Sequence, residues 1–120
     1  MENQFDWQKY YDVEKPTETK DFIMQQTMIR VRDPAVSLDF YIKTLGFNLV
    51  WGKDFPQWGF SVYFVAYCDK DKIPKDESQR WNFCMTTPGC VELTWNHGSE
   101  KEAAPLYNTG NSDATGSADG

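Results

Sequence analysis

Apolar and polar positions alternate along several short segments of this chain and recur at helical spacing along one. Residues 22–31, FIMQQTMIRV, place polar side chains at alternate positions among apolar and β-branched ones, which predicts a strand. Asp33 and Pro34 follow as a helix start, since Asp is a good N-cap and Pro fits the first helical position. Apolar residues then recur at helical spacing, and Gly46 supplies the stop. We therefore expect a helix over residues 35–45.

The rest of the body is typical of strands joined by turns. FNLVW at 47–51 is expected to form a second strand, FSVYFVAYC at 60–68 a third and CVELTW at 90–95 the last. Residues 69–79 are interpreted as a charged loop, and WNFCM at 81–85 as the start of a further strand whose independent pairing stays open. The order β-α-β-β-β is compatible with a parallel pair formed by the first two strands. It predicts an α+β module, with a helix on one face of a mixed sheet and the other face free to form a cavity.

Composition limits what the chain can be. With 120 residues, 40% of them hydrophobic and 16% aromatic, it suits one globular domain. We expect a polar arm at 1–21, the structured module at 22–98 and a flexible, linker-like tail at 99–120. The aromatic residues of the arm, Trp7, Tyr10 and Tyr11, are expected to dock on another surface.

Charge and cysteine content exclude several classes of function. A net charge of −6 argues against nucleic-acid binding, and no apolar run is long enough to span a membrane. The polar N-terminus has no apolar signal core. Three cysteines without CxxC spacing are typical of free thiols in a reducing compartment. We therefore expect a cytoplasmic protein that binds neither nucleic acid nor a membrane.

Polar residues that could carry chemistry lie on the first and last predicted strands. Gln26 and Arg30 share one face of the first strand, and Glu92 and Asn96 share one face of the last. At about 3.3 Å per residue, each pair spans roughly 13 Å, a length that suits a small peptide-like ligand. Alternating strands normally turn polar residues toward solvent, and spacing alone favours that simpler interpretation.

Longer stretches of the sequence change that balance. These stretches are TKDFIMQQTMIRVRDPAVSLDFYIKTLGF, DFPQWGFSVYFVAY, VELTWNHGSE and YNTGNSD. In this order they resemble the opening module of lactoylglutathione lyases (glyoxalase I). The resemblance spans nearly everything from Thr19 to Asp113. It implies membership of the vicinal-oxygen-chelate superfamily, the glyoxalase/bleomycin-resistance/dioxygenase type, built from paired βαβββ modules. This element order agrees with the one predicted from the pattern.

The resemblance also assigns roles to individual residues. Gln26 of the QQT motif and Glu92 of the VELT motif look like metal ligands, and Glu92 in addition like the group that moves the proton. Arg30 and Asn96 resemble the residues that hold glutathione. The apolar wall around the small carbon substituent of the substrate corresponds to Phe55, Phe60, Val62 and Phe64. The implied reaction isomerises the hemithioacetal of methylglyoxal and glutathione to S-lactoylglutathione, with Zn²⁺ or alternatively Ni²⁺ as the metal.

The family's two remaining ligands, a His and a Glu, belong to a second module that does not follow here before Gly120. The single histidine, His97, stands in a WNH sequence where HNW is more familiar, and it is expected to be a rim residue. Three interpretations stay open: a truncated lactoylglutathione lyase that needs the missing module, a half-enzyme that pairs with a second copy, or a non-catalytic module that binds a small molecule or a metal.

Overall fold

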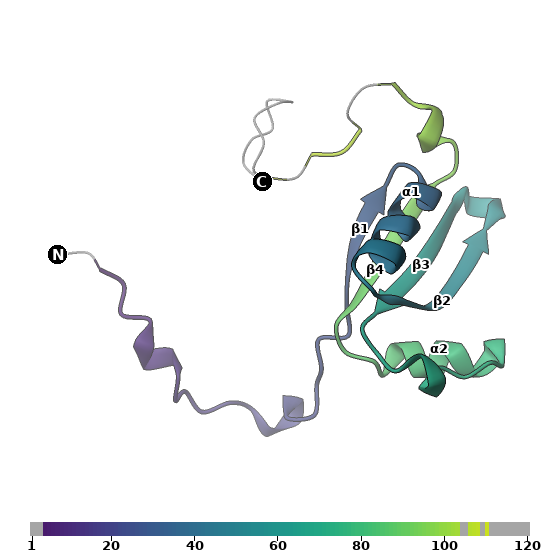
Figure 1. The fold of residues 1–120 in the computed structure, drawn as a ribbon. Coiled ribbons are helices and arrows are strands. Elements are labelled where there is room, and N and C mark those ends of the chain that lie inside the picture. The colour runs from purple at the N-terminus through teal and green to yellow at the C-terminus, as the bar shows by residue number, and fades with distance from the viewer. Residues whose placement is uncertain (1–3, 104–105, 109, 111–120) are drawn as a thin grey trace.

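A single mixed sheet forms the body of the protein in this computed structural model, which describes residues 4–103, 106–108 and 110. The strands lie in the order β1-β4-β3-β2 (Figure 1). Their bounds are Gln26–Val31 for β1, Asn48–Phe55 for β2, Phe60–Ala66 for β3 and Cys90–Asn96 for β4. β1 is parallel to β4, whereas β3 is antiparallel to both β2 and β4. The predicted α+β module with a mixed sheet is therefore confirmed.

The predicted pairing of the first two strands is wrong. β1 and β2 run in the same direction, but they lie at opposite edges of the sheet, with β4 and β3 between them. The parallel partner of β1 is β4, the last strand of the chain. This arrangement matters for function because it brings residue 26 of the first strand close to residue 92 of the last.

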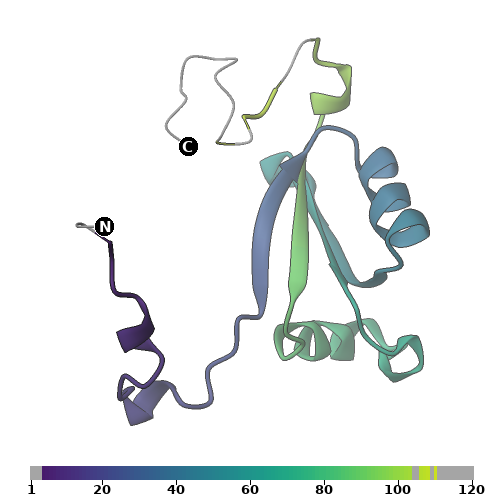
Figure 2. The same cartoon turned by 60° about the vertical axis from the view of Figure 1, so that its left-hand side comes forward.

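The predicted helix begins where its sequence signals indicate. α1 spans Pro34–Leu38 and continues as a π-helical segment, Asp39–Thr44. The Asp33 carboxylate accepts a hydrogen bond from the Ala35 N–H at 3.0 Å, and Gly46 ends the helix with a φ of +83°. This helix covers one face of the sheet, as the view along the sheet edge in Figure 2 shows. Leu93 of β4 is fully buried on that side.

The interpretation of WNFCM as a strand is wrong. Residues 81–85 lie in α2, which spans Glu77–Met85 and packs against β2. The Asp76 carboxylate caps this helix by accepting from the Ser78 N–H at 3.1 Å. Of the apolar residues that suggested a strand, Cys84 is fully buried in the core, and Phe83 and Met85 pack against that core.

The predicted first strand starts too early, because β1 begins only at Gln26. Its partner strand begins at Cys90, which is paired with Gln26. Before Gln26, the carbonyl oxygens of Met24 and Gln25 still accept hydrogen bonds from the Gly89 and Cys90 N–H groups, but the strand register does not continue. Phe22 and Met24 are each 76% exposed, and the chain before β1 leads away from the sheet (Figures 1 and 2).

The limits of the arm and of the tail stay predictions. Most of the predicted flexible tail lies outside the described residues. Where it begins, the Ser99 hydroxyl donates to the Arg32 carbonyl oxygen at 2.6 Å, and the Arg32 guanidinium donates to the carbonyl oxygen of Glu102. Across the described part of the chain, no helix has the length and apolar character needed to cross a membrane.

Candidate metal and substrate site

Two of the predicted ligands meet on the face of the sheet opposite α1. In the parallel register of β1 and β4, Gln26 pairs with Cys90 and Met28 with Glu92, so Gln26 and Glu92 are diagonal neighbours on one face. The Gln26 Nε2 donates a hydrogen bond to the Glu92 Oε1 at 2.5 Å. Both side chains are half-buried. The fold thus joins two residues that lie 66 positions apart in sequence.

Aromatic and aliphatic side chains surround this pair. A cavity of about 310 Å³ opens beside it. Besides Gln26 and Glu92, its lining contains all the residues predicted for the apolar wall, together with two tryptophans: Phe55, Phe60, Val62, Phe64, Trp51 and Trp81. The antiparallel register explains this gathering, since Phe60, Val62 and Phe64 alternate along β3 and Phe64 lies directly beside Glu92. The cavity therefore holds one carboxylate and one amide within otherwise apolar walls.

The apolar walls of the cavity change the acidity of the Glu92 carboxyl. Burial raises the pKa of the Glu92 carboxyl above its ordinary value, and this desolvation is the strongest influence on it. Hydrogen bonds with Gln26 and Thr94 and the charge of Arg30 lower the pKa of Glu92 without cancelling that effect. A carboxyl with a raised pKa is closer to exchanging its proton at neutral pH, which suits general acid–base work.

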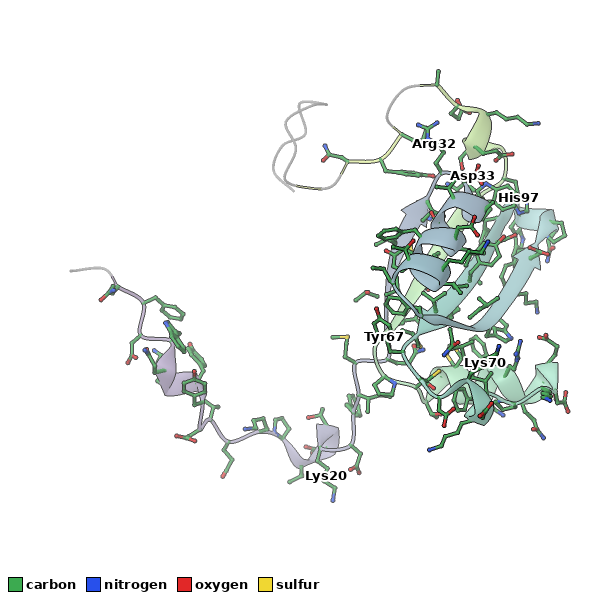
Figure 3. The ribbon with its side chains drawn as sticks, viewed as in Figure 1. Lys20, Arg32, Asp33, Tyr67, Lys70 and His97 are labelled. Carbon is green, nitrogen blue, oxygen red and sulfur yellow. The ribbon has the colours of Figure 1, made fainter. Side chains whose placement is uncertain are left out.

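The two residues predicted to hold glutathione lie apart from the cavity. Arg30 and Asn96 sit where β1 and β4 end, at the end of the sheet marked by Arg32 and His97 in Figure 3. Both are exposed, and neither lines the cavity. Each borders a hollow of its own, and the two hollows share Tyr107. The structure thus brings six of the eight predicted residues together and leaves these two at one end of the same sheet.

Comparison with known proteins identifies the family of this chain. The model of the Glyoxalase/Bleomycin resistance protein/Dioxygenase superfamily matches residues 23–115. The chain belongs to this superfamily. It is 45% identical over 98 residues to a lactoylglutathione lyase of Pseudomonas putida, an alignment that covers 82% of this chain and 57% of that protein. It is 37% identical over 98 residues to a lactoylglutathione lyase of Pseudomonas aeruginosa, covering 82% and 55%, respectively.

A more distant relative agrees with these two. Glyoxalase I of Saccharomyces cerevisiae is 35% identical over 99 residues, covering 82% of this chain and 30% of the yeast protein. The chain therefore spans little more than half the length of the bacterial relatives and less of the yeast one. The predicted resemblance to lactoylglutathione lyases is confirmed at the level of sequence.

The side chains of this superfamily member fit part of a metal site. The carboxylate of Glu92 is an oxygen ligand, and rotating the Gln26 amide would turn its oxygen toward the same point in place of its nitrogen. The other cavity residues are apolar. Within the described ranges, no three His, Cys, Asp or Glu side chains lie close enough together to hold a metal. The donor set suits two positions of a coordination sphere, so further ligands would have to come from water, substrate or another surface.

Sequence reasoning missed Trp51 and Trp81 as parts of this site. Trp51 lies in a predicted strand but has no predicted role, although it pairs with Phe64 across the sheet and so shares the face of Glu92. Trp81 lies in a segment that the pattern predicts as a strand. The Asp-Glu-Ser sequence at 76–78 was the signal that could have identified a helix start before it. The two indole rings lie 4.7 Å apart.

His97 takes no part in the cavity. Its Nε2 lies 2.8 Å from the Ser61 Oγ, and that hydroxyl donates to the Asp54 Oδ1 at 2.5 Å. Since the hydroxyl proton is directed at Asp54, the Ser61 oxygen accepts from the Nε2–H of His97. This chain of hydrogen bonds ties the end of β4 to β3 and β2. Because the carboxylate contacts Ser61 and not the imidazole, it is not the arrangement of a catalytic triad.

Proposed function

We propose that this chain supplies half of a lactoylglutathione lyase site, acting on the hemithioacetal of methylglyoxal and glutathione. The observation that carries the proposal is the contact of Gln26 with Glu92 inside the aromatic cavity. The names of the relatives support the same reaction, although the chain spans only about half of the bacterial ones. The product of this reaction is S-lactoylglutathione.

The proposed metal is Zn²⁺, with Ni²⁺ as the alternative, held by the Glu92 carboxylate and the Gln26 amide oxygen. A bound divalent ion would polarise the oxygens of the hemithioacetal and acidify the neighbouring C–H. A neutral amide beside one carboxylate leaves more of the metal's positive charge in place than two carboxylates would. In this proposal the two side chains provide oxygen ligands, consistent with either ion.

Glu92 is also the proposed acid–base group. Its carboxylate would accept the proton from one carbon of the substrate and return it to the adjacent carbon. The raised pKa of Glu92 describes the metal-free chain, whose apolar surroundings favour the protonated carboxyl. A bound divalent cation would instead favour the ionised carboxylate, which is the form that accepts a proton. Phe55, Phe60 and Phe64 would exclude water from the small carbon substituent during the transfer.

Arg30 and Asn96 are proposed to hold the glutathione part. Their place at the end of the sheet is consistent with a ligand that extends from the cavity along β1 and β4. The Arg30 guanidinium is exposed and suited to binding a carboxylate through paired hydrogen bonds. This division separates affinity for glutathione from the chemistry at Glu92.

The proposed partner is a second copy of the chain or a second module that supplies the missing ligands. Support comes from the sheet face that carries Glu92, because α1 covers the opposite face and α2 lies only at one end of the sheet (Figure 2). The arm also exposes Trp7, Tyr10 and Tyr11, which suit burial against another surface. The proposed compartment is the cytoplasm, and the free thiols of Cys84 and Cys90 support this proposal.

An isomerase assay tests this proposal. The purified chain would be mixed with methylglyoxal, glutathione and Zn²⁺ or Ni²⁺, and formation of S-lactoylglutathione would be followed together with the oligomeric state. We expect metal-dependent turnover by a dimer, abolished by a chelator and by Glu92→Gln. A folded monomer that binds metal without turnover would show that catalysis requires a second module. Ligand binding that is unchanged in both Gln26→Ala and Glu92→Ala would support a non-catalytic module instead.

A further inference from the structure

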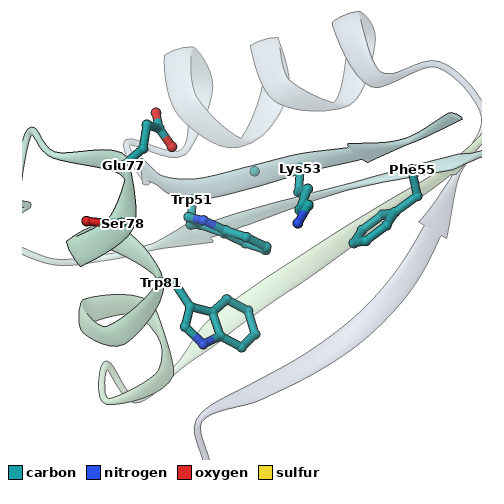
Figure 4. A pocket seen from close by; sticks show the side chains of 7 residues that line it. Trp51, Lys53, Phe55, Glu77, Ser78 and Trp81 are labelled. Carbon is teal, nitrogen blue, oxygen red and sulfur yellow. The ribbon is translucent and has the colours of Figure 1, made fainter.

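A second, larger hollow adjoins the aromatic cavity and has no role in the function proposed so far. This Lys53 groove has a volume of about 610 Å³ and lies between β2 and α2 (Figure 4). Its lining is Trp51, Gly52, Lys53, Phe55, Glu77, Ser78 and Trp81. Trp51, Phe55 and Trp81 also line the aromatic cavity beside Glu92. A ligand group that fills the cavity can therefore continue directly into the groove.

The walls shared by the two hollows are aromatic. The Trp51 and Trp81 rings lie 4.7 Å apart with an interplanar angle of 61°, and Phe55 stacks on Phe60 at 4.9 Å. Trp81 is 43% exposed, so part of its ring remains open to a ligand. Aromatic rings favour other flat rings in offset or edge-to-face arrangements. The groove consequently suits a flat substituent.

The groove is lined by one cation, Lys53, and one anion, Glu77. The Lys53 Nζ lies 5.4 Å from the centre of the Phe55 ring, and none of the described carboxylates is within ion-pair distance of it. Glu77 also lines the groove, but its Oε1 lies 3.9 Å from the Arg80 Nη1, which offsets its charge. In Figure 4 the Lys53 side chain projects between Trp51 and Phe55. An ammonium group above a ring, with water on its other side, can bind an anion without losing an existing partner.

We propose that the Lys53 groove binds a flat aromatic group that carries a carboxylate, with the rings of Trp51 and Trp81 against its face and the Lys53 ammonium against its charge. Resting on the proposed function, this extends the substrate class from methylglyoxal to 2-oxoaldehydes whose substituent is an aryl carboxylate. The carbonyl carbons would lie beside Glu92, and the aryl carboxylate would reach into the groove. Binding in the groove itself does not depend on turnover.

The first experiment uses probes without any glutathione or aldehyde: 2-naphthoate and its neutral analogue, 2-naphthalenemethanol. Affinities would be measured by calorimetry, and the site would be located from NMR shifts of the indole N–H groups. We expect naphthoate to bind about fivefold more tightly than the alcohol, the size of one solvent-exposed ion pair. Lys53→Gln, which keeps much of the aliphatic stem, should remove this preference and leave binding of the alcohol unchanged.

Two further variants locate the effect. Lys43→Gln makes the same change of charge on the helix at the other face of the sheet, where Lys43 pairs with Asp39, and it should leave both affinities unchanged. Trp81→Ala should weaken both probes alike, because it removes ring contact and not charge. A naphthoate preference that survives Lys53→Gln, or that disappears instead in Arg30→Gln, would overturn the proposal.

A turnover experiment separates this inference from the proposed function. The hemithioacetals of phenylglyoxal and 4-carboxyphenylglyoxal would be compared under the conditions of the isomerase assay. A preference for the carboxylated substrate that Lys53→Gln abolishes would support the groove as a determinant of specificity. If naphthoate binds in the groove but no substrate turns over, the groove stands and the catalytic proposal fails. If methylglyoxal turns over but naphthoate does not bind, the groove proposal fails alone.

Discussion

The contact of Gln26 with Glu92 makes a prediction that can be measured without metal or substrate. A hydrogen bond to a charged acceptor contributes about 1.5–3 kcal/mol to the free energy of unfolding, against roughly 0.5–1.5 kcal/mol for a neutral acceptor. Because both side chains are only half-buried, solvent screening favours the lower values. The charged form of Glu92 should thus gain about 1 kcal/mol more from Gln26 than a neutral acceptor would.

A double-mutant cycle isolates this difference. Gln26→Met removes the donor at similar volume, and Glu92→Gln keeps an acceptor but removes the charge. Urea unfolding, followed by tryptophan fluorescence, should give a coupling free energy of about 1 kcal/mol at pH 7. At about pH 3.5 the carboxyl of Glu92 is protonated, so the coupling should fall close to zero. A coupling below roughly 0.3 kcal/mol at pH 7, or one that persists unchanged at the lower pH, would refute the reasoning.

The single change at Glu92 has its own pH dependence, and further changes test other contacts. The pKa of Glu92 is higher in the folded chain than in the unfolded chain. The free energy of unfolding therefore falls as the pH rises past these two pKa values and Glu92 becomes ionised. Glu92→Gln should accordingly stabilise the metal-free chain at pH 7 and not below pH 4. Arg30→Ala should weaken binding of S-substituted glutathiones about tenfold in calorimetry while leaving zinc affinity unchanged, and equal losses would contradict the separation of the two sites. Leu93→Ala should lower the free energy of unfolding by about 2–5 kcal/mol in urea melts, because Leu93 is fully buried under α1. Ser61→Ala should cost about 0.5–1.5 kcal/mol in the same melts, since it removes the hydrogen bond from the buried Ser61 hydroxyl to the exposed carboxylate of Asp54; no change would show that the bond is not formed in solution.

Local patterns in the sequence predicted the elements that carry their own signals. The Asp33–Pro34 start and the Gly46 stop defined the first helix, because both act through bonds and dihedral angles within a few residues. The strands over Phe60 and Glu92 were recognisable because β-branched and aromatic residues are concentrated there. The resemblance, and not the alternation, grouped Phe60, Val62 and Phe64, which the structure places on one face of β3.

Pairing between distant segments could not be obtained in this way. Nothing in the sequence near Gln26 indicates that its partner strand starts at Cys90 and not at Asn48, since the choice depends on packing of the whole sheet. The contact of Gln26 with Glu92 therefore entered only through resemblance to a family. The same limit explains Trp81, whose apolar neighbours fit a short strand or a helix equally well until the cap at Asp76 is considered.

The chemistry proposed for Glu92 depends on two effects of opposite sign that come from different strands. The rings of β2 and β3 desolvate the carboxyl and raise its pKa, whereas Gln26 of β1 stabilises the ionised form and lowers it. Neither effect alone would suit proton transfer near neutral pH. A buried carboxyl without a hydrogen-bond donor would stay protonated at that pH, and a fully solvated carboxylate would be a weak base. The sheet order β1-β4-β3-β2 places β4 between these two influences, so Glu92 contacts an amide on one side and Phe64 on the other. Strand order, which could not be predicted here from local pattern, thus sets the acidity that Glu92 has in the metal-free chain.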